Sequence, residues 1–167
     1  MEKKGNFEIL TGKHVIELIK DEQNEKIVKG VKCDDGTILN SDYFVFCNNE
    51  SIRDIVKYPL IRMCGFSWTF YKKDSQNQEL IEEVSDSHNM SIGTRCVSPN
   101  GVPIVGLLNG FENAFVNTGH GFLGWTLSSY TGKLLSKIVI KQIDQEVQLD
   151  EQEKNILKHV SSERYWF

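Results

Sequence analysis

The chain has 167 residues, of which 40% are hydrophobic and 25% are charged, a composition typical of one soluble globular domain. Its formal net charge is −4 and it has no block of basic residues, so we expect no nucleic-acid partner. The charged start, MEKKGNFEIL, cannot form the apolar core of a signal peptide, and nowhere do about 18 apolar residues run together. We therefore expect a cytoplasmic protein that is soluble or, at most, peripherally attached to a membrane.

The first fifty residues are predicted to form a hairpin and a third strand. Residues 14–20 (HVIELIK) and 26–33 (KIVKGVKC) are rich in β-branched side chains and are joined by a polar linker, a pattern typical of a β-hairpin. Gly36 allows a tight turn into residues 37–48, which we interpret as one strand containing the apolar run YFVF. A strand that is apolar on both faces is expected to be buried, often in a parallel sheet.

The middle of the chain alternates between apolar and polar segments. Residues 50–56 suit a short helix that ends before Pro59, and residues 65–73 (GFSWTFYKK) alternate like a strand. Residues 74–88 are polar and suit a loop or a short exposed helix. Residues 91–106 contain a Pro-Asn-Gly turn between two apolar stretches.

The last third is predicted to be a strand, a glycine turn and a long helix. Residues 113–119 (NAFVNTG) form a short strand that runs into glycines. From His120 onward, apolar side chains recur at helical spacing on one stripe, whose members are Leu123, Leu127, Leu134, Leu135, Ile138 and Val139. The tail is polar with one short amphipathic stretch.

The four cysteines are Cys33, Cys47, Cys64 and Cys96. Their spacing is irregular, with no Cys-x-x-Cys pair or Cys/His cluster that would form a zinc site. We expect reduced, mostly buried thiols in a reducing compartment, and no bound metal.

Residues 119–124, GHGFLG, match the G-x-G-x-x-G pattern between a predicted strand and a predicted helix, as in a dinucleotide-binding fingerprint. That fingerprint also requires a second strand ending in an acidic residue about 20 positions on, whereas Asp144 is predicted at the end of the helix. We therefore favour another interpretation. Backbone without side chains and the positive end of a helix dipole would accept an electron-rich ligand there.

Residues 117–139, NTGHGFLGWTLSSYTGKLLSKIV, are similar to the closing segment of FAD-dependent D-amino acid dehydrogenases of the D-amino acid oxidase superfamily, where a GHG..GWT element meets the flavin ring. Residues 94–106 resemble that family's G-x-R-P…P-D-G-x-P-x-x-G stretch, and the final SSERYWF resembles its usual Arg-aromatic ending. The resemblance implies a partial FAD-linked reductase fold of mixed α/β or α+β class. Its parts would be an N-terminal β-hairpin and strand, a central antiparallel piece and a long C-terminal helix, without a complete Rossmann βαβ unit.

The resemblance also implies roles for individual residues. Those expected to line the flavin are Gly119, His120, Gly121, Gly124, Trp125 and Thr126. In the family, the helix after the glycines points its N-terminus at the pyrimidine edge of the flavin and stabilises its anionic reduced form. Arg95 matches the residue that pairs with the substrate carboxylate, a task for a planar bidentate donor; a surface arginine in a hairpin is the alternative. No side-chain base is required, and a structural hydrogen bond suits His120 at least as well as catalysis.

Three departures from the family pattern affect the expected function. No strand, glycine fingerprint and helix precede residue 15, so we expect the part that binds the ADP moiety to be absent. The strand that packs under the flavin ends in Cys47-Asn48-Asn49, where the family has small residues. The substrate-domain insertion is short, and Cys96 replaces the proline after the arginine.

We therefore expect one incomplete FAD-dependent oxidoreductase domain, residues 1–167. Its segments would be a sheet portion (1–58), a truncated substrate portion (59–110), the flavin-contacting strand, turn and helix (111–143) and a tail (144–167). The expected function is oxidative deamination of a D-amino acid by hydride transfer to FAD. Two alternatives remain open: a non-catalytic fragment or truncated paralogue that does not bind FAD alone, and a relative of the sarcosine, glycine or proline amine oxidases. A protein partner that supplies the missing half is a further alternative.

Overall fold

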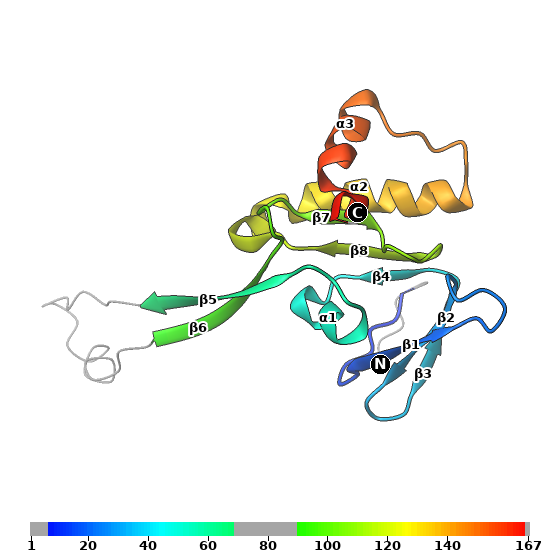
Figure 1. Ribbon diagram of the computed structural model, residues 1–167, viewed down its shortest axis with the longest axis horizontal. Coiled ribbons are helices and arrows are strands. Elements are labelled where there is room, and N and C mark those ends of the chain that lie inside the picture. The colour runs from blue at the N-terminus through cyan, green and yellow to red at the C-terminus, as the bar shows by residue number, and fades with distance from the viewer. Residues whose placement is uncertain (1–6, 69–89, 166–167) are drawn as a thin grey trace, which may run out of the picture.

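A computed structural model describes residues 7–68 and 90–165, whose strands form three small sheets, and C-terminal helices cover one face of the central sheet (Figure 1). The elements are β1 (Val15–Lys20), β2 (Val28–Cys33), β3 (Ile38–Asn40), β4 (Phe44–Phe46), η1 (Asn49–Ser51), α1 (Ile52–Ile55), β5 (Ile61–Trp68), β6 (Met90–Val97), β7 (Ile104–Leu107), β8 (Ala114–Thr118), η3 (Gly121–Leu123), α2 (Gly124–Ile143), α3 (Glu151–Val160) and η4 (Ser162–Tyr165). The predicted mixed α/β or α+β class is confirmed.

The N-terminal sheet has the antiparallel order β1-β2-β3, which confirms the predicted hairpin. Gly36, at φ +83°, makes the turn into β3. The prediction of one strand over residues 37–48 is wrong, because β3 pairs with β2 whereas β4 belongs to a different sheet. The Asn113 amide fixes this break: its Nδ2 donates to the backbone oxygen of Val28 at 2.7 Å and to that of Asp42 at 2.8 Å.

The central sheet has the order β4-β8-β7, with β4 parallel and β7 antiparallel to β8. Side chains alternate between its two faces, as the pleat requires. Ile104 and Val116 pack into a core that includes residues of β2, β4 and α1, while Val105 and Phe115 pack against residues of α2 and α3. The sheet thus joins segments that are distant in sequence and separates two cores. Figure 1 shows α2 and α3 on one side of it and α1 with the N-terminal sheet on the other.

The prediction that the YFVF strand is buried on both faces is wrong at Val45. Phe44 and Phe46 are buried, but Val45 is 48% exposed. It lies on the outer strand of the sheet, whereas α2 contacts β7 and β8, and α3 contacts β7. The helical cover therefore does not reach the outer strand, so one face of β4 stays open to solvent.

The long C-terminal helix is confirmed but begins at Gly124, because a 3₁₀ turn first occupies Gly121–Leu123. Leu134 and Leu135 are buried against the sheet, whereas Leu123, which was predicted to belong to the same apolar stripe, is 55% exposed and outside the core. After α2 ends, Asp150 and Glu153 form a capping box that starts α3.

Side-chain contacts hold the C-terminal helices in place. An ion pair between Lys137 and Glu153 ties α2 to α3. Beyond α3, Arg164 donates from Nη2 to the backbone oxygens of Val102 at 2.6 Å and Pro103 at 3.0 Å, and its guanidinium lies 4.6 Å from the ring centroid of Tyr165. Arg164 and Tyr165, from the Arg-aromatic ending noted in the sequence, thus hold η4 beside β7.

β5 and β6 form an antiparallel hairpin that extends away from the body of the protein (Figure 1). Gly65 lies opposite Gly93, and Phe66 opposite Ile92. The predicted strand in GFSWTFYKK is confirmed through residue 68, while its last residues and the polar segment 74–88 lie outside the described residues.

All four cysteines are free thiols, as expected. The prediction that they are mostly buried holds for Cys33 and Cys96, whereas Cys47 and Cys64 are exposed. In the described parts of the chain, no group of three or more His, Cys, Asp or Glu residues is placed to hold a metal ion. None of the helices that the structure describes combines the length and apolar character needed to cross a membrane.

Candidate functional site

A pocket of about 280 Å³ lies where β4 and β8 end. Because these strands are parallel, their carboxyl ends meet at the same edge of the sheet, the usual position of ligands in open α/β sheets. The lining residues are Cys47, Asn49, Thr94, Arg95, Cys96, Asn117, Thr118, Gly119, His120, Gly121 and Gly124. They come from the end of β4, from β6, from β8 and from the glycine turn that leads into α2.

The glycine turn requires its glycines. Gly119 has φ +76° and Gly121 has φ +55°, both in the left-handed region that other residues avoid. A side chain at Gly119 would also place its Cβ 3.3 Å from the Cβ of Ser98. An isolated β-bridge between His120 and Val97 joins the turn to the end of β6, so the turn lies beside the strand that carries Arg95.

The electrostatics of the pocket favour negative charge. The 3₁₀ turn η3 begins at Gly121 and leads directly into α2, and neither element has a side-chain cap. The first backbone N–H groups of this turn, beginning with that of Gly121, therefore have no acceptor within the helix. They add to the positive end of the α2 dipole. Among the residues that line the pocket, Arg95 alone carries a formal charge.

Arg95 lies across the β5–β6 hairpin next to the pocket. The Cζ atom of its guanidinium is 4.8 Å from the ring centroid of Phe122 in η3. A Cβ atom built at Gly65 would lie 2.9 Å from the same Cζ atom, so the guanidinium occupies the space beside that glycine. Within residues 7–68 and 90–165, Arg95 makes no ion pair.

His120 is held by a hydrogen-bond network inside the protein. Its Nε2 lies 3.1 Å from Oγ1 of Thr131, which donates to the backbone oxygen of Leu127 at 3.1 Å and also accepts from Nδ2 of Asn117 at 3.4 Å. We assign the hydroxyl proton to the backbone oxygen of Leu127, an assignment that makes Nε2 of His120 the donor and leaves Nδ1 as an acceptor. Burial lowers the pKa of His120, so its ring is neutral at pH 7.

Two further polar groups shape the pocket wall. Oδ1 of Asn117 is buried and has no hydrogen-bond partner in the described structure, an arrangement that calls for a ligand or water donor. Cys47 is exposed as a residue, but partial shielding of its thiol from water raises the pKa of that thiol, so the group is protonated at neutral pH and a weak nucleophile. Cys47 and Asn49 do line the pocket, where the sequence departs from the small residues of the resembled family.

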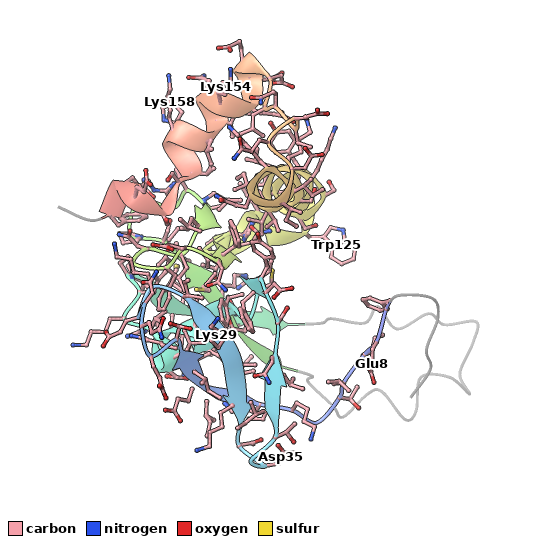
Figure 2. All side chains as sticks on the ribbon, turned by 90° about the vertical axis from the view of Figure 1, so that its right-hand side faces the viewer. Glu8, Lys29, Asp35, Trp125, Lys154 and Lys158 are labelled. Carbon is pink, nitrogen blue, oxygen red and sulfur yellow. The ribbon has the colours of Figure 1, made fainter. Side chains whose placement is uncertain are left out.

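The structure brings five of the sequence-predicted site residues to one pocket: Arg95, Gly119, His120, Gly121 and Gly124. Trp125 and Thr126 do not line it. Trp125 is 97% exposed and points away from the body of the protein (Figure 2). Flavin contact by these two residues stays a prediction.

Sequence reasoning missed Asn117 and Thr131. Asn117 belongs to the strand that runs into the glycines, so the end of β8 was a signal that could have found it. Thr131 carries no motif. Its role depends on where the His120 ring points, which the spacing of residues does not fix.

Comparisons with known proteins agree with this geometry. A 47-residue segment is 49% identical to D-amino acid dehydrogenase from Allorhizobium ampelinum and covers 28% of this chain and 11% of that protein. L-amino acid deaminase from Proteus vulgaris superposes with a TM-score of 0.63 at 12% identity, over 92% of this chain and 49% of that one. Fructosyl amine:oxygen oxidoreductase from Aspergillus fumigatus gives 0.61 at 10% identity, over 89% and 48%. No family profile matches the chain.

The chain is similar in sequence to one segment of a D-amino acid dehydrogenase and similar in fold to solved amino-acid and amine oxidoreductases. It has the fold of one part of these oxidoreductases and spans about half the length of the solved structures it matches. The glycine turn is not part of a βαβ unit in the described residues. The parallel neighbour of β8 is β4, which precedes it, and no strand follows α2. The structure therefore gives no support to the dinucleotide fingerprint.

The resemblance to FAD-dependent enzymes implies a flavin, and the residues present fit part of one. Gly119, Gly121 and Gly124 leave backbone open to a flat ring. The volume, about 280 Å³, is just below the about 300–1,000 Å³ of small-molecule pockets. The described pocket therefore suits one edge of the cofactor and not the whole of FAD.

Proposed function

We propose that this chain forms one wall of the flavin and substrate sites of an FAD-dependent oxidoreductase that acts on amino acids or related amines. The observation that carries the proposal is the meeting of Arg95 with the glycine turn and the start of α2 in one pocket. A permanently charged bidentate donor and a helix N-terminus beside bare backbone suit two different ligand groups. The arginine suits a carboxylate, and the helix suits the electron-rich edge of a ring.

Each residue in the pocket has a defined task in this proposal. The backbone at Gly119 and Gly121 allows close approach of the ring, and the N–H groups at the start of α2 stabilise negative charge on its edge. Arg95 pairs with the substrate carboxylate and so orients the substrate. Neutral His120 and Asn117 fix the turn and offer acceptors. When bound, the flavin supplies hydride acceptance from the carbon that bears the amine.

We further propose a D-amino acid as the substrate. The similarity to D-amino acid dehydrogenase supports this choice, at 49% identity over 47 residues. The solved structures of similar fold include enzymes named for L-amino acids and fructosyl amines, so the fold alone favours no single substrate. The test must therefore compare both enantiomers.

A second candidate function is a non-catalytic chain that does not bind FAD alone. Two observations favour it: the chain spans about half of the similar solved structures, and the pocket suits only part of the cofactor.

The visible absorbance of the purified chain, with and without added FAD, separates the two candidates. Bound flavin that bleaches with D-alanine or D-proline, but not with the L-enantiomers, supports the first. Arg95→Lys is the matched variant, since lysine keeps the charge but loses the bidentate fork. It should keep flavin binding and weaken the substrate response by about tenfold or more, equivalent to about 1.4 kcal/mol or more. No flavin binding at saturating FAD would refute the enzyme proposal for this chain.

A further inference from the structure

The Arg95 guanidinium is enclosed on two sides by groups from two different elements. On one side Phe122 of η3 presents its ring, with the centroid 4.8 Å from Cζ. On the other side lies Gly65 of β5, where a Cβ atom would be 2.9 Å from Cζ and 3.4 Å from Nη2. We call this pair, Gly65 and Phe122, the arginine clamp.

The position of Gly65 in the hairpin explains the close approach. Met63 of β5 lies opposite Arg95, so Gly65 is the next residue along β5 on the same face of the ribbon. The arginine side chain crosses the ribbon diagonally and fills the space that a side chain at residue 65 would take. Gly93, directly opposite Gly65, has no such task, because a Cβ there meets no described atom within 4 Å.

A clamp of this kind leaves the N–H groups at the edge of the guanidinium accessible to a ligand. Stacking on a ring uses the face of the guanidinium, whereas hydrogen bonds to a carboxylate use the N–H groups at its edge. Arg95 can therefore stay stacked while it pairs with an anion. A long arginine side chain loses rotamer freedom when it binds, so holding it beforehand strengthens binding.

We propose that Gly65 and Phe122 are positioning residues that hold Arg95 in the orientation required to pair with a carboxylate at the mouth of the pocket. This inference rests on the proposed function, in which Arg95 is the carboxylate-binding residue. It adds two residues, from β5 and η3, that determine how well Arg95 performs that task.

The test uses nuclear magnetic resonance of the whole chain, without added flavin. Protons of Arg95 that lie over the Phe122 ring should be shifted upfield by its ring current. Phe122→Leu and Gly65→Ala should each abolish this shift, the first by removing the ring and the second by displacing the flexible arginine. Phe122→Tyr should retain it. Gly93→Ala and Phe66→Leu are matched controls in the same hairpin and should leave it unchanged.

The second measurement is the dissociation constant for acetate, followed at the Arg95 Nε–H signal. Phe122→Leu should raise it about two- to fivefold, the range of an exposed cation–π contact. Gly65→Ala should raise it at least as much, while Phe122→Tyr and both controls stay at the wild-type value. Absence of the upfield shift, unchanged acetate binding in the clamp variants, or no acetate binding by the wild-type chain would each overturn the proposal.

The flavin experiment keeps the two proposals separate. If the clamp variants behave as expected but the chain never binds FAD, the clamp stands and the enzyme proposal fails. If flavin binds and bleaches with a D-amino acid while Arg95 shows no ring-current shift, the enzyme proposal stands and the clamp is wrong.

Discussion

Replacement of Thr131 by valine tests the network that holds His120. Thr131 is 5% exposed, and valine has nearly the same shape but lacks the hydroxyl. The change leaves Nε2–H of His120 and Nδ2–H of Asn117 without the acceptor they share at 3.1 Å and 3.4 Å. An unsatisfied buried donor costs about 1–3 kcal/mol. Both partners are only half-buried, so we expect a total loss of about 1–3 kcal/mol in the free energy of unfolding.

Urea unfolding of the wild type, Thr131→Val and Thr131→Ser measures this loss. Serine keeps the hydroxyl and removes one methyl group, so it should also cost about 1 kcal/mol. The tautomer of His120, read from the ¹⁵N shifts of its ring, separates the two variants. Serine should keep the proton on Nε2, whereas valine should let the two tautomers mix. If Thr131→Val loses under about 0.5 kcal/mol and leaves the tautomer unchanged, Thr131 is not the acceptor for His120 and the reasoning is refuted.

Three further predictions concern stability. Burial lowers the pKa of His120 from 6.5, so the stability that the neutral ring contributes is complete above pH 6.5 and is lost as the pH falls toward the folded-state pKa. Across that pH range His120→Gln should therefore lose less of its free energy of unfolding than the wild type loses. Parallel curves of unfolding free energy against pH for the two proteins would contradict this. Arg164→Lys loses the hydrogen bond to Val102 and should cost about 1.5–3 kcal/mol in urea unfolding, with a loss under about 0.5 kcal/mol as the contrary result. Asp150→Ala removes the cap of α3 and should cost about 1 kcal/mol, whereas the control Glu151→Ala, outside the capping box, loses an exposed ion pair with Lys154 and should cost under about 0.5 kcal/mol.

The fold was predictable where local pattern and tertiary contacts agree. The hairpin of β1 and β2 follows from alternation and turn residues, and α2 follows from its apolar stripe. The split of residues 37–48 was not predictable, because the side chain of Asn113 causes it from 71 residues away. The exposure of Val45 depends on which strand is outermost in the sheet, a property of topology that a single strand does not encode.

The site was predictable only in its backbone. The glycines show where left-handed backbone is needed, and the resemblance to D-amino acid dehydrogenases picked out Arg95. The partners of these residues were not predictable. Gly65 lies within a predicted strand and Phe122 between two glycines, and the sequence predicts no role for either residue. Their task arises only when β5 and η3 meet at Arg95.

The two halves of the proposed function depend on different parts of the protein. The arginine clamp is built from β5, β6 and η3, which all lie within the described residues. The proposed flavin wall is the part of the pocket lined by the glycine turn and Cys47. Two apolar side chains next to it in sequence are open to solvent: Trp125, beside Gly124, is 97% exposed, and Val45, two residues before Cys47, is 48% exposed. An aromatic side chain buries about 150–250 Å², worth about 4–6 kcal/mol at about 25 cal/mol per Å², so covering Trp125 would strongly favour whatever completes this wall. Carboxylate recognition should therefore persist in this chain alone, whereas flavin affinity should depend on how that apolar edge is covered.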